Sequence, residues 1–259
     1  MSYFCSTIDN MKHPRNILQA SAMHACLQIA ERSRYYLIAL SLLASLTAVT
    51  VLYAQSPIST AAAMEQQGMV NVQLLDSTIH VSLMYSRPDN FTGTVLYTDL
   101  RDAYLHPKAV EALLKAQKRL RQLRPDLSII VFDAARPMSI QQKMWDKVKG
   151  TSKYFYVSNP ANGGGMHNYG LAVDISLCNA ATGDTIPMGT TIDHMSPLSH
   201  ITDEPSLVSN GLISPEALAN RQLLRSVMTY AGFKPLATEW WHFNLVSRAV
   251  ARKYYNVIK

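Results

Sequence analysis

A histidine and an aspartate flank a glycine in the second half of the chain. His167 precedes Asp174 by seven residues, and Gly170 lies between them at a point where the chain can bend. Asp174 occupies an otherwise apolar stretch, where a buried carboxylate needs a cation or hydrogen-bond donors. A pair at this spacing more often makes a structural hydrogen bond than a metal site, so on its own it leaves both interpretations open.

A glutamate lies three residues before a histidine in the segment Glu239-Trp240-Trp241-His242. Positions i and i+3 of an ideal strand face opposite sides, so both can reach one site only if the strand bulges or ends, or if the segment is helical. An aromatic core strand with a hydrogen-bonded histidine is the simpler interpretation of this segment alone. Together, however, His167, Asp174 and His242 supply two imidazoles and one carboxylate, which suits an open zinc site with a fourth place for water. Glu239 is then the spare carboxylate that can take the proton of that water.

An arginine follows the apolar run at residues 127–132. Arg136 comes four residues after this run, with Asp133 close by as a possible acid. A surface salt bridge, worth well under ~1 kcal/mol, is one interpretation of the two residues. Beside a polarised carbonyl, Arg136 would instead hold the oxyanion of a tetrahedral intermediate.

The elements that must position these residues alternate between strand and helix patterns. Apolar alternation or short apolar runs predict strands at residues 70–75, 78–83, 127–132, 171–177 and 238–246. Apolar residues at helical spacing, with proline near the start or glycine at the end, predict helices that begin at Pro107, cover residues 138–149, and run from Pro215 to Gly232. The pattern predicts one α+β domain of ordinary size.

Residues 35–53 form a run of nineteen residues without a charged side chain, and Arg32 and Arg34 precede it. A basic flank, an apolar stretch and then small residues are the layout of an export signal. The run also approaches the ~20 residues that span a bilayer, so a retained anchor is an alternative, and a buried core helix is a third. We expect a signal or anchor extension at residues 1–63 and the working domain at residues 64–259. The long segment before the run leaves two translation starts open, Met1 and Met23.

The composition excludes several classes of protein. Of 259 residues, 48% are hydrophobic, which is enough for a sizeable core and argues against a disordered chain. The net charge of +6 is spread without a dense Lys/Arg run, so we expect no nucleic-acid partner. Cys5 and Cys26 precede the apolar run, and Cys178 alone lies in the domain, which leaves no disulfide framework.

Several short motifs occur in order from about Tyr85 to Asn244, and together they resemble the family of zinc D-alanyl-D-alanine dipeptidases, which includes the vancomycin-resistance type. The motifs are Tyr85 with Asp89-Asn90-Phe91-Thr92-Gly93, the segments 133–137 and 167–174, Thr182-Gly183-Asp184 with Pro187-Met188-Gly189, Asp193, Asn210-Gly211, Asn220-Arg221, and Glu239-Trp240-Trp241-His242. The resemblance implies one compact α+β fold, shared with D,D-carboxypeptidases and the hedgehog signalling domain.

The resemblance also implies roles for seven residues. His167, Asp174 and His242 match the ligands of one Zn²⁺ per chain, and Glu239 matches the catalytic base and acid. Arg136 matches the arginine that stabilises the transition state, Asp193 the acid that binds the ammonium group of the substrate, and Tyr85 a tyrosine near the pocket. The chain departs from the resistance type where it has Gly165-Met166 in place of serines and Ala134-Ala135 in place of Gly-Tyr.

The expected activity is zinc-dependent hydrolysis of the D-Ala-D-Ala dipeptide in cell-wall peptide metabolism, in the periplasm or cell envelope, by an exported or membrane-anchored protein. Two alternatives remain at this point. One is a D,D-carboxypeptidase that acts on longer peptidoglycan peptides, and the other is a zinc-bearing binding domain without catalysis. Glu239 and Arg136 argue against the second alternative, because a binding domain needs neither.

Overall fold

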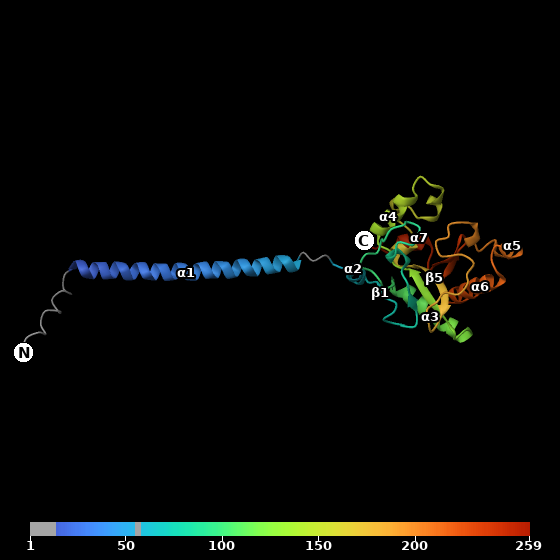
Figure 1. The fold of residues 1–259 in the computed structure, drawn as a ribbon, viewed down its shortest axis with the longest axis horizontal. Helices are drawn as coiled ribbons and strands as arrows, with labels where there is room; N and C mark the ends of the chain where they lie inside the picture. Colours follow the sequence, from blue (N-terminus) through green and yellow to red (C-terminus); the bar gives the residue numbers. More distant parts are fainter. Residues whose placement is uncertain (1–13, 55–57) are drawn as a thin grey trace, which may run out of the picture. The chain divides into compact units, whose positions relative to one another are not determined.

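The computed structural model describes residues 14–54 and 58–259, with side chains for residues 21–44 and 58–259 (Figure 1). The chain divides into two units, and the larger one runs from Ile58 to Lys259. This unit begins six residues before the predicted boundary at residue 64. It takes in the short helix α2 (Thr60–Gln66), whose Met64 is fully buried in the core.

A five-stranded sheet forms the centre of the domain, in the order β2-β4-β5-β7-β6. Its strands are β2 (His80–Val81), β4 (Leu127–Asp133), β5 (Ala172–Asn179), β7 (Glu239–Asn244) and β6 (Lys234–Leu236). β2 pairs with β4 in parallel, and all other neighbours are antiparallel. A separate two-stranded sheet joins β1 (Val70–Asn71) to β3 (Tyr104–Leu105). Helices and a mostly antiparallel sheet thus share one domain, which agrees with the α+β prediction.

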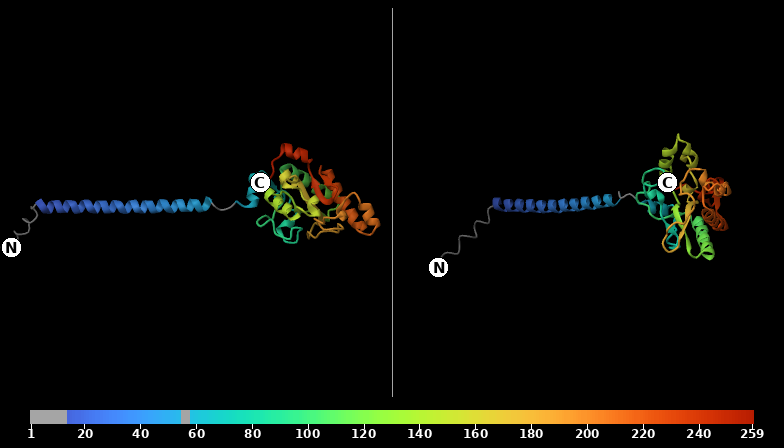
Figure 2. Two further views of the ribbon diagram at one scale, coloured as in Figure 1. Left: turned by 90° about the horizontal axis from the view of Figure 1, so that it is seen from above. Right: turned by 45° about the vertical axis from the view of Figure 1, so that its right-hand side comes forward.

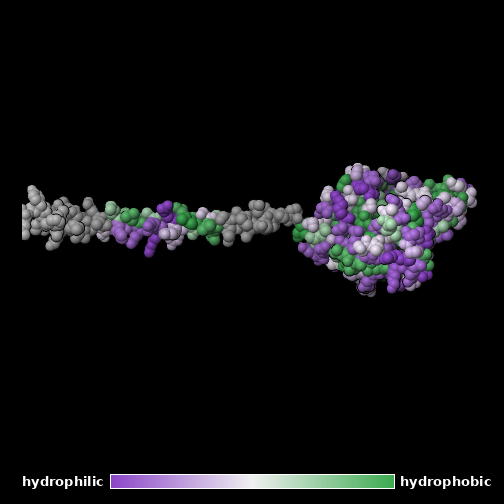
Figure 3. Space-filling view, turned by 60° about the horizontal axis from the view of Figure 1, so that its bottom comes forward, coloured by the Kyte–Doolittle hydropathy of each residue, from purple (hydrophilic) through white to green (hydrophobic). Residues whose placement is uncertain are grey.

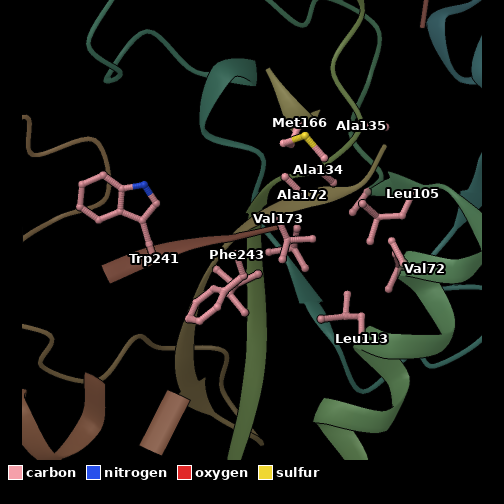
Figure 4. Close-up of a cluster of buried hydrophobic side chains, with 14 of the residues drawn as sticks. Val72, Leu105, Leu113, Ala134, Ala135, Met166, Ala172, Val173, Trp241 and Phe243 are labelled. Atoms are coloured by element: carbon pink, nitrogen blue, oxygen red, sulfur yellow. The ribbon is translucent and has the colours of Figure 1, made fainter. Parts of the chain in front are cut away.

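Two long helices cover one face of this sheet. Helix α3 (Pro107–Leu123) contacts β4, and helix α6 (Pro215–Tyr230) contacts α3 and strands β5, β6 and β7. Figure 4 shows Val173 and Phe243 on the side of the strands that faces Leu113 of α3, and Ala172 on the opposite side with Ala134 and Met166. Alternate residues of β5 therefore fill the core under the helices, and those between them face the other layer.

Shorter helices and loops cover the other face. They include α4 (Met138–Val148), the 3-10 helices η3 (Ser152–Tyr156), η4 (Pro160–Asn162) and η5 (Met166–Tyr169), and α7 (Arg248–Tyr254). The 3-10 helices η2 (Met84–Ser86) and η6 (Pro197–Ser199) and helix α5 (Glu204–Ser209) complete the domain. The predicted helices at residues 138–149 and from Pro215 agree with α4 and α6 to within two residues.

The first two predicted strands are wrong over most of their length. Only residues 70–71 and 80–81 are strand, because polar side chains turn the chain between them. The Asn71 carboxamide accepts a hydrogen bond from the amide of Gln73 at 2.9 Å, and the Asp76 carboxylate accepts one from the amide of Thr78 at 3.0 Å. Such local bonds compete with strand pairing.

The two ends of the domain lie side by side. The amide of Lys259 donates to the side chain of Gln67, just after α2, at 3.0 Å. Figures 1 and 2 show the C-terminus next to α2. The face drawn in Figure 3 is mostly hydrophilic, with small hydrophobic patches between polar residues.

The other unit contains helix α1 (Pro14–Ala54), which includes the apolar run at residues 35–53. The side chains of residues 45–53 lie outside the described residues. Among the helices of the described part of the chain, none is long and apolar enough to cross a membrane. The signal or anchor stays a prediction.

Candidate active site

Strand pairing brings the two halves of the predicted metal site together. Asp174 of β5 lies directly opposite His242 of β7, and its Oδ1 is 2.9 Å from His242 Nδ1. Asp174 Oδ2 is 3.3 Å from His167 Nε2, and the two imidazole nitrogens are 3.2 Å apart. One donor atom from each of these three buried residues lies within 4.8 Å of the others, a spacing that can hold a metal ion.

A tight bend at Gly170 carries the chain from His167 into β5. His167 lies in η5, and Gly170 ends this turn with φ = +64°, a left-handed conformation that favours glycine. A Cβ at this position would also lie 2.9 Å from the backbone nitrogen of His106. Glycine is therefore required here on both counts, and the bend places the imidazole over the start of the strand.

Strand β7 bulges at the site, and this explains how Glu239 and His242 reach the same pocket. Pro235 of β6 pairs with Phe243, but the next residue, Leu236, pairs with Glu239, so the register shifts by several residues. Trp241 and Phe243 would share a face in a regular strand, yet Figure 4 shows them on opposite sides of the ribbon. The Glu239 carboxylate lies 4.0 Å from His242 Nδ1, close to the three metal-type donors without being one of them.

Each imidazole is anchored through the nitrogen that faces away from the cluster. His167 Nδ1 lies 2.7 Å from the carbonyl oxygen of Ala134, and His242 Nε2 lies 2.9 Å from the side-chain oxygen of Asn244. Both partners are acceptors, so with a cation in the cluster each neutral ring can donate its N–H outward. The lone pairs of His167 Nε2 and His242 Nδ1 then converge with Asp174, and such a cluster of acceptors suits a cation.

Arg136 is held by a buried carboxylate at the end of β4. Its Nε donates to Asp133 Oδ2 at 2.9 Å, its Nη2 donates to the same oxygen, and its Nη1 donates to Gln141 at 2.8 Å. Tyr97 donates to the other oxygen of Asp133 at 2.7 Å. The ion pair is buried, not a surface salt bridge, and Arg136 Nη2 lies 3.9 Å from Asp174 Oδ2 at the edge of the metal-type cluster.

Tyr85 and Asp193 form a second polar group in the pocket. The Tyr85 hydroxyl donates to Asp193 Oδ2 at 2.6 Å, and the guanidinium of Arg136 lies 5.3 Å from the centre of the Tyr85 ring. Asp193 has φ = +58° and is the only non-glycine residue with positive φ in the described part of the chain. A residue held in this costly conformation at a site often serves its chemistry.

Burial controls the charge of the carboxylates in the pocket. Burial is the largest cause that raises the pKa of Glu239. Together with the charges of Asp174 and Asp193, and against the opposing effect of His242, it brings this pKa to about 8. Burial likewise raises the pKa of Asp193 to about 7, with Asp174 as the next cause. Burial also raises the pKa of Asp174, but the two imidazoles outweigh it and hold this pKa well below its ordinary value. Asp174 therefore stays ionised, whereas Glu239 and Asp193 titrate near neutral pH in the metal-free protein.

A single cavity of about 270 Å³ brings together the seven residues to which the resemblance assigns roles, whereas Asp133 lies behind Arg136 and does not line it. The side chains that line it include Tyr85, Arg136, His167, Asp174, Asp193, Glu239 and His242. The cavity thus combines a cluster suited to a cation, a separate carboxylate, an arginine and an acid with a tyrosine partner. This combination can support hydrolysis of a small substrate through an activated water.

Sequence reasoning missed the residues that orient these groups. Asn244 fixes the ring of His242, and Tyr97 and Gln141 fix the pair formed by Asp133 and Arg136. Asn244 lies two residues after His242 in a strand, and side chains at this spacing share a face, so the sequence held a signal for it. Nothing in the spacing of Tyr97 pointed to Asp133, which is 36 residues away.

Comparison with known proteins agrees with this geometry. Residues 65–259 match the family model Peptidase_M15, described as D-ala-D-ala dipeptidase. The chain is 32% identical over 181 residues to a D-alanyl-D-alanine dipeptidase of Escherichia coli. The aligned region covers 70% of this chain and 86% of the relative. It is 32% identical over 213 residues to the D-alanyl-D-alanine dipeptidase of Enterococcus faecium, with 72% and 97% covered, and 30% identical over 203 residues to that of Streptomyces coelicolor, with 71% and 95% covered. The resemblance predicted from the motifs is confirmed, and the chain belongs to the D-Ala-D-Ala dipeptidase family of metallopeptidases.

Proposed function

We propose that the protein is a zinc-dependent peptidase that hydrolyses the D-Ala-D-Ala dipeptide in the cell envelope. The observation that carries the proposal is the convergence of two imidazole nitrogens and one carboxylate beside a fourth, separate carboxylate. Two histidines and one carboxylate are an open zinc ligand set, and both outward N–H groups have acceptors that orient the rings. The residues present therefore fit a zinc ion.

A zinc ion held by His167, Asp174 and His242 would polarise the scissile carbonyl and lower the pKa of a water molecule to about 7. Glu239 takes the proton of the attacking water and returns it to the leaving amine. Because Asp174 raises the pKa of Glu239, a cation bound at Asp174 offsets that effect and favours the ionised base. Arg136, aligned by Asp133 and Gln141, donates to the oxyanion.

The pocket also suits the amino end of a dipeptide. Asp193 is half-buried beside Tyr85 and has no arginine or lysine within ion-pair distance among the described residues. An ammonium group bound there would compensate the carboxylate, which burial otherwise keeps from ionising readily. We therefore assign Asp193 to the free amino terminus of the substrate, with Tyr85 holding the acid in place.

The test is amine release by the purified full chain, with and without zinc, from D-Ala-D-Ala, its N-acetyl form and a cell-wall pentapeptide. The free dipeptide should be hydrolysed with a kcat/KM roughly 10²–10⁴-fold above that of the acetylated form, because breaking a buried charge pair costs about 3–5 kcal/mol. Equal rates on all three substrates would indicate a D,D-carboxypeptidase instead. Full activity in the presence of a strong chelator would contradict the requirement for a metal ion.

We also propose that the protein is exported and either cleaved or anchored near residues 35–53. The support is the sequence layout, with Arg32 and Arg34 before an uncharged run, together with the exposure of Tyr35, Leu37 and Leu40 on helix α1. For the domain, we propose the fold shared with D,D-carboxypeptidases and the hedgehog signalling domain, and the mixed sheet with helices on its face supports this. Cell fractionation of the full chain against a version lacking residues 1–57 tests the location. Both forms in the cytoplasm would contradict export.

A further inference from the structure

The pocket contains a second arginine for which the mechanism above has no task. Arg248, at the start of α7, lines the cavity and is otherwise exposed. Its Nη2 donates to the carbonyl oxygen of Gly164, and no carboxylate lies within ion-pair distance of it among the residues that the structure describes. A guanidinium carries five N–H donors, so most of those of Arg248 remain available to a ligand.

Arg136, by contrast, already has protein partners, and its two remaining N–H groups are assigned to the oxyanion. Three of its N–H groups donate to Asp133 and Gln141, and its charge is balanced by the buried carboxylate. Of the two arginines that line the cavity, Arg248 is therefore the one with a net positive charge to offer an anion. No lysine lines this cavity.

A serine hydroxyl lies beside the same segment of chain. Ser158 lines the cavity, and its Oγ is 3.0 Å from the position that a Cβ on Gly165 would occupy. The Ser158 carbonyl is fixed by Gln141 at 2.8 Å, but its hydroxyl has no hydrogen-bond partner in the described part of the chain. Because Gly165 has no side chain, this hydroxyl reaches into the space next to Gly164, to which Arg248 is bonded.

We propose that Arg248 and Ser158 bind the C-terminal carboxylate of the substrate. This inference rests on the proposed function, and it assigns the negative end of the dipeptide as Asp193 is assigned to the positive end. A carboxylate is matched by the planar fork of an arginine, and a hydroxyl can donate a further hydrogen bond to it. Both side chains border Gly164-Gly165, which leads into His167, so the carboxylate would be held next to the reacting bond.

The test compares D-Ala-D-Ala with its C-terminal amide, using the full zinc-loaded chain. Arg248→Gln should lower kcat/KM on the free acid by about 10–100-fold, chiefly through KM, because hydrogen bonds to charged groups are strong. It should change hydrolysis of the amide by less than about threefold. Arg252→Gln is the matched control, since Arg252 lies one turn later on α7 and donates from its Nη2 to the carbonyl oxygen of Asn162, outside the cavity. That variant should behave as the unmodified protein on both substrates.

The outcomes separate this inference from the proposed function. An equal loss of kcat/KM on the acid and the amide in Arg248→Gln would show that Arg248 only supports the Gly164 segment. No loss on either substrate would also overturn the inference. In both cases the proposed dipeptidase activity would be unaffected. Failure of the unmodified protein to hydrolyse either compound would overturn the proposed function and this inference with it.

Ser158 has its own test. Ser158→Ala should lower kcat/KM on the acid by about 10–100-fold, the range of a hydrogen bond to a charged group, and leave the amide unchanged. Adding Gly165→Ser to that variant should restore use of the acid, because the new side chain enters the space that the Ser158 hydroxyl vacated. Gly165 has φ = −104°, so serine is not strained there. A loss shared by the amide, or a double variant that stays impaired, would overturn the role of Ser158.

Discussion

Replacement of Asn244 by leucine should weaken metal binding although every metal ligand remains. The Asn244 side-chain oxygen lies 2.9 Å from His242 Nε2, where it can accept the outward N–H and so leave Nδ1 unprotonated toward a bound cation. Leucine has a similar size but offers no acceptor. The neutral imidazole can then move its proton to Nδ1, where Asp174 Oδ1 accepts it at 2.9 Å. This alternative hydrogen bond occupies both ligands and competes with the cation.

The expected loss follows from this competition. Removal of an outer partner of a ligating histidine typically costs 10–100-fold in metal affinity, or about 1.4–2.7 kcal/mol. We expect the upper part of that range, because the competing tautomer has a ready acceptor in Asp174. Asn244→Asp should retain the affinity, since a carboxylate also accepts the N–H.

The assay is a titration of the metal-free protein with zinc against a chelator of known affinity. Asn71→Leu is the control, because Asn71 is also half-buried and accepts one hydrogen bond, from the amide of Gln73, but lies in β1 outside the cavity. It should lower stability and leave the zinc affinity unchanged. An Asn244→Leu protein with an affinity within twofold of the unmodified protein would refute the argument that this hydrogen bond sets the tautomer.

Three further predictions concern the groups around the cluster. Glu239→Ala should keep zinc bound but lower the turnover rate by ~10²–10⁴-fold, whereas His242→Ala should lose the metal as well. A fully active Glu239→Ala protein would contradict the role of Glu239 as the base. Arg136→Ala should lower kcat by ~10²–10³-fold with little change in KM, because an oxyanion donor acts on charge that develops in the transition state. A rise in KM alone would show that Arg136 binds the substrate and does not stabilise the oxyanion. The metal-free protein should lose stability from about pH 5 to pH 8. Burial is the main cause that raises the folded-state pKa of Glu239 to about 8 and that of Asp193 to about 7, so the folded state binds more protons than the unfolded state. The stability that these groups contribute below their unfolded-state pKa values is therefore lost as the pH rises through the folded-state values. Thermal melts in chelator should show this fall, and Glu239→Gln should flatten it.

The ligand types could be predicted from the sequence, whereas their assembly depends on strand pairing. The glycine bend between His167 and Asp174 is local, and the sequence indicates it directly. The pairing of Asp174 with His242 joins residues 68 positions apart, and the bulge that brings in Glu239 arises from the register between β6 and β7. From the spacing of Glu239 and His242, one could say only that the strand must bulge or end for both to reach one site. In the structure, the strand bulges.

The failures of prediction also have physical reasons. Residues 70–75 and 78–83 alternate apolar and polar as strands do, but Asn71 and Asp76 turn the backbone before pairing can extend. The partners of the site residues, such as Tyr97 and Asn244, are polar residues without a motif, and their roles arise only from what lies across from them. Ser158 acquires its position from the missing side chain of Gly165, a relation that the sequence does not display.

The hydrogen bonds also separate the part of the site that performs hydrolysis from the part that selects the substrate. The amide of Arg136 donates to the carbonyl oxygen of His167 at 3.0 Å, and Asn168 donates back to the carbonyl oxygen of Arg136 at 2.8 Å. The oxyanion donor and the first metal-type ligand are thus fixed to each other through main chain at the end of the sheet. Ser158 and Arg248 come from outside the sheet and lie against the glycine segment of this unit, and the carbonyl of Ser158 is also held by Gln141. Variants at Arg248 should therefore change substrate preference at constant zinc affinity, whereas Asn244→Leu should lower zinc affinity at constant preference for acid over amide. A variant at either position that changed both properties would contradict this division.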